Sequence, residues 1–458
     1  MLIIPAIAVL FTYVYWRLHQ VYEVFQPLTI YTALGLVAFG FVLDLRVKTI
    51  RPRGSPLLAL LLGLFVWSAI TVVVKAPEAI SQQLILLITC LIAFLAVSEG
   101  LQGLRSFGIA AGVLVVFSIA LASLGVEQGL SSKTCHLRPT TFAKGYDAAL
   151  ELSDGRSCEA IADCLEGGLP DTEYLCEHDG LLDTHSIGGR VRYRGILEDP
   201  NELSWAINMA IPLAFAIYER RRTKRRLLIA LVTLVLGAAC VIMTQSRSGQ
   251  IGILATLGVY FIRRFGWRGA LLGAVAALPL VLLGGRSGEG AESSSEERLN
   301  CWNEALSMWR DNPFMGVGKG QFTENYYLTA HNSFLLALAE LGPIGLLLFS
   351  AALYYAVKVT LQAQSQFATH PQAASVRSWS TALLASLAGL VASAIFLTLT
   401  FHTILWINLG LVGGLYAAIR VHEPSFEVKL GWKDLAIVAG LDVVFVASIA
   451  VYLRMKGI

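Results

Sequence analysis

Charge is scarce in this chain. Asp, Glu, Lys and Arg together make up 15% of its 458 residues, whereas 55% of the residues are hydrophobic. The mean hydropathy is +0.64. A soluble globular protein does not need so much apolar surface, because its exterior must be largely covered by polar groups. The composition therefore excludes an ordinary soluble protein and predicts one whose excess apolar surface faces lipid.

The apolar residues gather in long runs that charged residues rarely interrupt. A helix of roughly 17–25 apolar residues has the length that crosses the hydrocarbon core of a bilayer. We identify about thirteen such runs, near residues 2–16, 27–43, 56–74, 82–98, 107–126, 203–219, 227–244, 249–262, 270–285, 332–357, 380–398, 403–419 and 434–453. The first run lacks a basic leader and a small-residue cleavage site, so we expect a retained span. The predicted fold class is an all-α polytopic membrane protein with about 12–13 transmembrane helices.

The basic residues cluster in short segments between these runs, at 46–53, 219–226 and 263–268. Lys and Arg beside short loops stay on the cytoplasmic side. Counting spans alternately puts all three clusters on one side and the N-terminus inside. Two long polar segments, 127–202 and 286–331, then lie outside, and transmembrane helices fill 1–126, 203–285 and 332–458. Each basic cluster is a short turn between spans, so binding of nucleic acid is the weaker interpretation.

The first outside segment contains four of the seven cysteines: Cys135, Cys158, Cys164 and Cys176. Disulfides persist in oxidising compartments, so we expect two bridges, for which three pairings are possible. A metal site is the alternative, because His136 and His178 stand near two of these cysteines. The irregular spacing favours bridges.

The same segment ends in a group of arginines followed by a helix start. Alternate side chains of an extended backbone share a face, so Arg190, Arg192 and Arg194 are expected to point the same way. Three guanidinium groups together repel one another unless an anion lies between them. The alternative is contact with lipid headgroups. The following Asp199-Pro200 pair predicts a capped helix start.

The second outside segment opens with a Gly/Ser/Glu stretch that we expect to be mobile. Apolar residues then recur at helical spacing, at positions 299, 302, 306 and 309, which predicts a helix lying flat at the membrane interface, with Arg298 one turn before Trp302. The glycines of 312–322 do not form a Walker loop, because no Lys-Ser/Thr pair follows at the required spacing. No nucleotide, metal or other cofactor is predicted.

Two further polar groups stand at the ends of apolar runs. Arg247 follows one run and either extends to the interface or faces the bundle interior as a functional group. His331 and Asn332 precede another run, where the alternative to a functional role is a simple helix cap. Arginine binds phosphate oxygens through a planar fork, and histidine exchanges a proton near neutral pH. Together these groups predict transfer from a lipid diphosphate to a hydroxyl, with His331 as general base.

Three sequence stretches, SRSG, ERLNCWNEALSMWRDNPFMGVGKGQF and HNSFLLALAELGPIGLLLF, resemble in order the signature region of the O-antigen ligase and O-antigen polymerase superfamily. RGILEDPNELSW is similar to the arginine and Pro-Asn stretch of that superfamily. The resemblance implies a GT-C-like, inverting, metal-independent glycosyltransferase of the bacterial inner membrane with two large periplasmic segments. Its donor would be an undecaprenyl-diphosphate-linked glycan.

By motif position, the resemblance implies that His331 is the essential histidine. It also implies that Arg298, Arg194 and Arg247 are the superfamily arginines, whereas Arg190 and Arg192 have no counterpart in the motif. The acceptor would be lipid A-core in a ligase, or another lipid-linked repeat in a polymerase, and we favour the ligase slightly. A glycolipid transporter is the further alternative, but it would carry charges deep within several spans.

Overall fold

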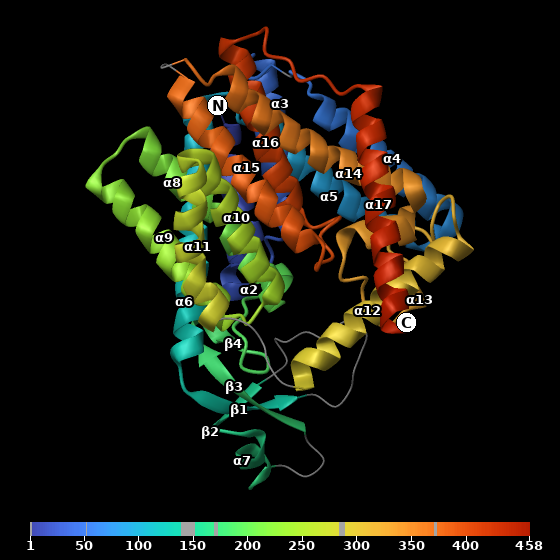
Figure 1. Ribbon diagram of the computed structural model, residues 1–458. Helices are drawn as coiled ribbons and strands as arrows, with labels where there is room; N and C mark the ends of the chain where they lie inside the picture. The colour runs from blue at the N-terminus through green and yellow to red at the C-terminus, as the bar shows by residue number, and fades with distance from the viewer. Residues whose placement is uncertain (1, 52, 139–151, 169–172, 284–288, 371–372) are drawn as a thin grey trace.

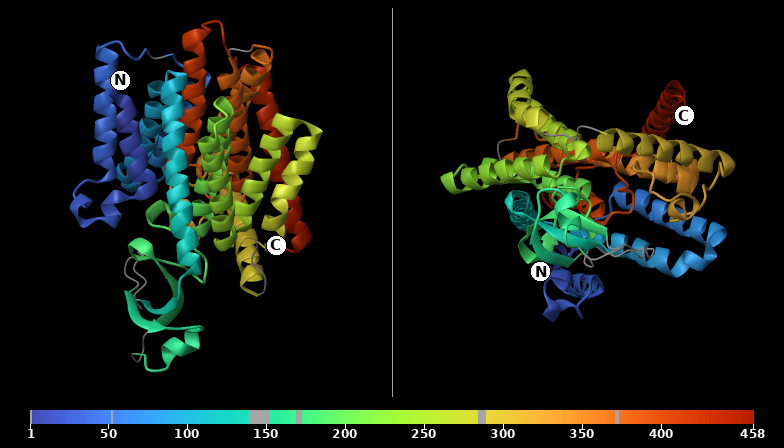
Figure 2. Two further views of the ribbon diagram at one scale, coloured as in Figure 1. Left: turned by 90° about the vertical axis from the view of Figure 1, so that its left-hand side faces the viewer. Right: turned by 90° about the horizontal axis from the view of Figure 1, so that it is seen from below.

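The computed structural model describes residues 2–51, 53–138, 152–168, 173–283, 289–370 and 373–458. Long helices stand side by side in a bundle, and a small sheet projects from one end (Figures 1 and 2). The all-α polytopic fold class is therefore confirmed. The two chain termini lie at opposite ends of the bundle (Figure 1).

Each predicted apolar run forms a helix. The helices are α1 (Ile3–Phe11) with its continuation η1 (Thr12–Trp16), α3 (Ile30–Arg46), α4 (Pro56–Lys75), α5 (Ile80–Gly100), α6 (Leu104–Leu130), α8 (Pro200–Arg220), α9 (Lys224–Met243), α10 (Arg247–Phe265), α11 (Trp267–Leu283), α14 (Ser333–Gln366), α15 (Ala374–Ala394), α16 (Thr403–His422) and α17 (Trp432–Lys456). Short helices join some of them: α2 (Leu18–Val21), η2 (Glu23–Phe25) and η3 (Pro77–Ala79).

Seven of the described helices are long and apolar enough to cross a membrane by length and composition: α4, α5 with η3, α6, α9, α14, α16 and α17. Their surroundings differ. In its most apolar window, α16 is 89% buried, whereas α17 is 11% buried, so α16 is central and α17 is peripheral. Glycine allows the close approach of α16 to α5, because a Cβ at Gly413 would lie 2.7 Å from the Cβ of Ser98. Small residues at helix contacts are typical of membrane bundles.

The cysteine-containing segment is a folded unit with strands of its own. It forms an antiparallel sheet of order β2-β1-β3-β4, from β1 (Lys133–Arg138), β2 (Leu152–Ser157), β3 (Glu173–Gly180) and β4 (Thr184–His185), with the short helix α7 (Ile161–Leu165). The predicted disulfides are present as Cys135–Cys164 and Cys158–Cys176. They cross-link a unit too small to bury a large apolar core.

The helix predicted from the apolar positions 299, 302, 306 and 309 exists, and it begins well before them, as α12 (Glu289–Asp311). The described part of the stretch expected to be mobile, from residue 289 onward, is therefore helical. The apolar face of α12 packs against other helices of the bundle. Trp302 and Leu306 are buried in the main core, and α12 contacts α14 and α17. The expectation of a helix lying with its tryptophans on lipid is therefore wrong, because the bundle itself covers that face.

The glycine-rich segment after α12 donates hydrogen bonds to α14 where Pro343 interrupts the hydrogen bonds of that helix. Proline has no N–H and cannot bond the carbonyl four residues earlier, so Pro343 leaves the Ala339 carbonyl without its helical partner. The Val317 N–H donates to that carbonyl at 2.8 Å, and the Gly318 N–H donates to the Glu340 carbonyl at 3.0 Å. The buried side chains of Lys319 and Glu340 form an ion pair at 3.6 Å. These contacts fix the segment, including α13 (Phe322–Asn325), that leads to His331.

We expect the substitution Glu340→Ala to destabilise the protein by about 3–5 kcal/mol, because Lys319 would remain charged and buried without its partner. Thermal unfolding of the detergent-solubilised protein, followed by tryptophan fluorescence, measures the loss. The double variant Lys319→Met/Glu340→Met removes both charges and should recover most of the stability. A double variant as unstable as Glu340→Ala would contradict this explanation.

Candidate functional site

A cavity of about 650 Å³ opens at the end of the bundle that bears the sheet, where the start of α8, α12 and the segment before α14 converge. It brings together four of the predicted site residues: Arg190, Arg192, Arg298 and His331. The remainder of its lining is Ile187, Gly188, Gly195, Glu198, Asp199, Pro200, Asn201, Glu202, Ser294 and Glu297. Predicted site residues separated by as much as 141 positions in the chain (190 to 331) therefore share one cavity.

Arg190 is held by the start of α8 and the end of α9. Its Nε donates to the carbonyl of Thr244 at 3.0 Å, and one of its terminal nitrogens donates to Oδ1 of Asn201 at 3.3 Å. The same Oδ1 accepts from the hydroxyl of Ser246 at 2.7 Å. Asp199 caps α8, as predicted, by accepting from the Asn201 N–H at 2.8 Å. Asn201 therefore joins the starts of α8 and α10, a role that the sequence analysis missed.

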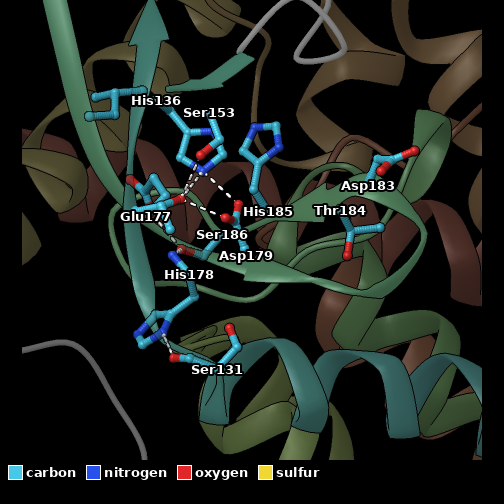
Figure 3. A network of polar contacts seen from close by, with 12 residues as sticks. Ser131, His136, Ser153, Glu177, His178, Asp179, Asp183, Thr184, His185 and Ser186 are labelled. Carbon is cyan, nitrogen blue, oxygen red and sulfur yellow. Dashed lines mark hydrogen bonds and ion pairs between the residues drawn. The ribbon is translucent and has the colours of Figure 1, made fainter. Parts of the chain in front are cut away.

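Arg192 is buried, lines the cavity and also contacts the sheet. Its Nε donates to the carbonyl of His185 at 3.0 Å, a terminal nitrogen lies 2.5 Å from Nε2 of His185, and another lies 3.6 Å from Glu198. A guanidinium has donors only, so Nε2 of His185 accepts. The ring of His185 stacks on that of His136, whose Nε2 lies 2.8 Å from Asp179 (Figure 3). This chain of contacts connects the cysteine-linked sheet to the cavity.

A buried carboxylate in the sheet shapes the turn that leads to these arginines. Glu177 accepts hydrogen bonds from the Ser186 hydroxyl at 2.5 Å, the Gly188 N–H at 2.6 Å and the Gly189 N–H at 3.0 Å (Figure 3). Both glycines have positive φ, which glycine adopts without strain. Glu177 directly follows Cys176, so a disulfide fixes the strand that carries it.

Arg194 departs from the expectation that all three arginines share the site. It does not line the cavity. Its guanidinium donates to the carbonyls of Leu182, Asp183 and Gln20. Burial does not alternate along this stretch, since Val191, Arg192 and Tyr193 are all buried. The carbonyls of Leu182 and Asp183, in the turn before this stretch, accept hydrogen bonds from the Arg194 guanidinium.

Arg247 lies beside the large cavity in a small pocket of about 30 Å³. It is the first residue of α10, and its guanidinium donates to the Ser295 hydroxyl of α12 at 2.9 Å. Arg190 and Arg298 also line this pocket, together with Asn201, Gln245, Ser294 and Ser295. No carboxylate is among these lining residues. The arginine-rich side of the site therefore lies where α10 and α12 meet.

His331 is half-buried at the cavity wall, in a left-handed backbone conformation with φ of 46°. Burial lowers the pKa of His331, and the positive charge of Arg298 lowers it further, while Asp199 and Glu297 act in the opposite direction. Its imidazole is therefore held in the neutral form, which can accept a proton. The adjacent Asn332 caps α14 by accepting from the N–H groups of Phe334 and Leu335, both at 3.0 Å. The capping interpretation is thus correct for Asn332, and His331 faces the cavity.

The fold and the site together define a polytopic membrane protein with an arginine- and histidine-lined cavity at one end. The model of a protein family described as O-Antigen ligase matches residues 231–350. The resemblance is thereby confirmed over this region, and the match supports a membrane enzyme of the O-antigen ligase or polymerase type. The matched region runs from α9 into α14 and contains Arg247, Arg298 and His331. A search of curated proteins finds no match to this chain.

We expect Asn332→Ala to destabilise the start of α14 by about 1 kcal/mol, because two helix N–H groups lose their acceptor. Asn332→Ser supplies an alternative cap and should keep most of that stability. The midpoints of thermal unfolding of the two variants measure the difference. Equal losses in both would show that capping is not the role of this residue.

Proposed function

We propose that the protein transfers a glycan from an undecaprenyl-diphosphate carrier to a hydroxyl acceptor at the periplasmic face of the bacterial inner membrane. The observation that carries this proposal is the shared cavity of Arg190, Arg192, Arg298 and His331. The O-antigen ligase match supports lipid-linked glycans as the substrate class. The assignment of this cavity to the periplasmic side rests on the basic clusters between the apolar runs. Lys and Arg beside short loops are typical of the cytoplasmic side, so the cavity would open on the opposite side.

The arginines are suited to the diphosphate of the donor. Guanidinium groups bind phosphate oxygens in pairs and stay charged at any physiological pH. As the bond between the sugar and the diphosphate breaks, negative charge accumulates on the leaving diphosphate. Arg298 lines both the large cavity and the small pocket beside Arg247, which supports a role for it in stabilising that charge. The lipid tail would remain among the helices.

His331 is suited to activate the acceptor. Its neutral imidazole would take the proton of the acceptor hydroxyl as the hydroxyl oxygen attacks the anomeric carbon of the donor sugar. Attack opposite to the leaving diphosphate inverts the configuration at that carbon. The carboxylates that line the cavity, Glu198, Asp199, Glu202 and Glu297, can accept hydrogen bonds from sugar hydroxyls. The cavity thus offers arginines for the diphosphate, a histidine for the acceptor hydroxyl and carboxylates for the sugar hydroxyls.

We expect His331→Asn to reduce transfer by at least about 10²-fold, because the proton acceptor is lost. Asparagine tolerates the left-handed backbone at this position, so the fold should survive. Transfer is measured with purified protein and lipid-linked glycan, and the unfolding temperature of each sample checks its integrity. Near-normal transfer by a well-folded variant would eliminate His331 as the base.

The pH dependence of transfer should reflect the lowered pKa of His331. A base must be deprotonated to act, so activity falls as the pH decreases through this pKa, and the midpoint should lie below the ordinary value of about 6.5. Arg298→Gln removes a positive charge and should move the midpoint to higher pH, besides lowering the rate. A pH-rate profile for each protein measures both midpoints. A midpoint that stays unchanged or moves to lower pH in the variant would contradict the effect of the Arg298 charge on the pKa of His331.

A metal-independent reaction is part of this proposal, because the arginines supply the positive charge that a divalent cation would otherwise bring to a diphosphate. We expect an excess of chelator to leave the transfer rate unchanged. The comparison is made on one protein preparation, before and after chelator and again after added Mg²⁺. Loss of activity that Mg²⁺ restores would overturn this part.

The acceptor distinguishes a ligase from a polymerase, and we favour the ligase, which uses lipid A-core. Deletion of the gene, followed by analysis of membrane glycolipids, separates the two. Accumulation of lipid-linked polymer with no long glycan on lipid A indicates a ligase. Accumulation of single lipid-linked repeats indicates a polymerase.

A further inference from the structure

A second cavity lies at the other end of the bundle, among α1, the connection from α3 to α4, α6 and α16. Its volume is about 530 Å³, within the range of small-molecule sites. Four cationic side chains line it: Lys48, Arg51, Arg53 and Arg105. The other lining residues are Ile4, Thr49, Gln102, Gly103, Ser106, Ile109 and Val421. The proposed transfer reaction uses none of these residues.

Buried polar side chains hold the backbone that carries these cations. The side-chain amide of Gln102 accepts from the Arg51 N–H at 3.1 Å and donates to the Arg51 carbonyl at 2.7 Å. Glu99, which is 7% exposed, accepts from the Arg53 N–H at 3.1 Å. Arg53 and Arg420 each donate to the carbonyl of the other, at 3.2 and 3.1 Å. The segment 51–53 is therefore fixed on α5 and α16 at its two described residues.

Glu99 interacts electrostatically with Arg53, but within the described ranges no salt bridge joins the other cations that line the cavity, Lys48, Arg51 and Arg105, to a carboxylate. Asp44 bonds to the Ile3 N–H at 2.9 Å and to the Thr49 hydroxyl at 3.0 Å. The first turn of α6 adds the partial positive charge of a helix start, since Gly103 and Arg105 are at the cavity. Fixing like charges side by side costs free energy unless an anion accompanies them.

The walls of this cavity indicate the kind of anion. Ile4, Ile109 and Val421 line it beside the cations, and Ile109 is 47% exposed on the outer surface of α6. A phosphate group could contact the arginines while an attached acyl chain follows the apolar outer face. We propose that this cavity binds the phosphate headgroup of an anionic phospholipid in the leaflet opposite to the glycan-transfer cavity. Basic pockets between transmembrane helices bind such headgroups.

The test is binding of short-chain phosphatidylglycerol to the full-length protein in neutral detergent, measured by native mass spectrometry. Each cation near a membrane surface contributes about 1 kcal/mol, so Arg51→Gln/Arg105→Gln should weaken binding by about 30-fold, and Lys48→Gln by about fivefold. The matched control Arg222→Gln/Arg225→Gln removes two exposed arginines outside the cavity, one from the α8–α9 connection and one from the first turn of α9, and should leave the affinity unchanged.

Two comparisons decide between sources of the phosphate. Phosphatidylcholine has the same phosphodiester but no net charge, and it should bind much more weakly. Inorganic phosphate should compete poorly, because it lacks the acyl chains. Equal binding of phosphatidylglycerol by the Arg51/Arg105 variant, or equal binding of phosphatidylcholine, would overturn the proposal. Full competition by inorganic phosphate would show that the cavity binds a free anion and not a lipid headgroup. Glycan transfer by the same variants is a separate measurement, so failure here leaves the proposed transfer reaction unaffected.

Discussion

The structure depends on the hydrogen bonds between the glycine-rich segment and the broken turn of α14. Pro343 frees a carbonyl inside the bundle, where an unpaired polar group is costly, and Val317 supplies the missing donor. The same segment is held by the buried Lys319–Glu340 pair. Because the chain runs directly from these contacts to His331, a backbone defect in one helix sets the position of the histidine at the cavity wall.

The arginines of the site gain their positions from helix starts and from the sheet. Arg190 depends on Asn201 at the start of α8, and Arg247 is the first residue of α10. Arg192 depends on His185, and hence on a sheet that two disulfides hold together. Long, flexible side chains lose much conformational entropy when they are fixed, so each guanidinium needs such support to be ready for an anion.

The sequence predicts the helices well, because apolar length alone determines what crosses a bilayer, and it predicts the start of α8 from Asp199-Pro200. It does not predict the disulfide pairing, which depends on how α7 approaches β1 and on how the end of β2 approaches β3. The strands are short and polar, as in LSDGRS, so their pattern does not distinguish them from a loop. Arg194 shows a further limit: strand alternation does not reveal the carbonyls that bind it. Likewise, the apolar face of α12 does not reveal whether lipid or protein covers it.

The opposite placement of the chain ends has a practical consequence. A reporter fused after α17 and one fused before α1 would lie at opposite ends of the bundle (Figure 1). One pair of fusions, for example with a phosphatase that matures only outside the cytosol, would therefore assign both ends of the molecule at once. The cavity lined by Arg298 and His331 lies at the end of the bundle where α17 finishes, so the C-terminal fusion would report the side on which that cavity opens.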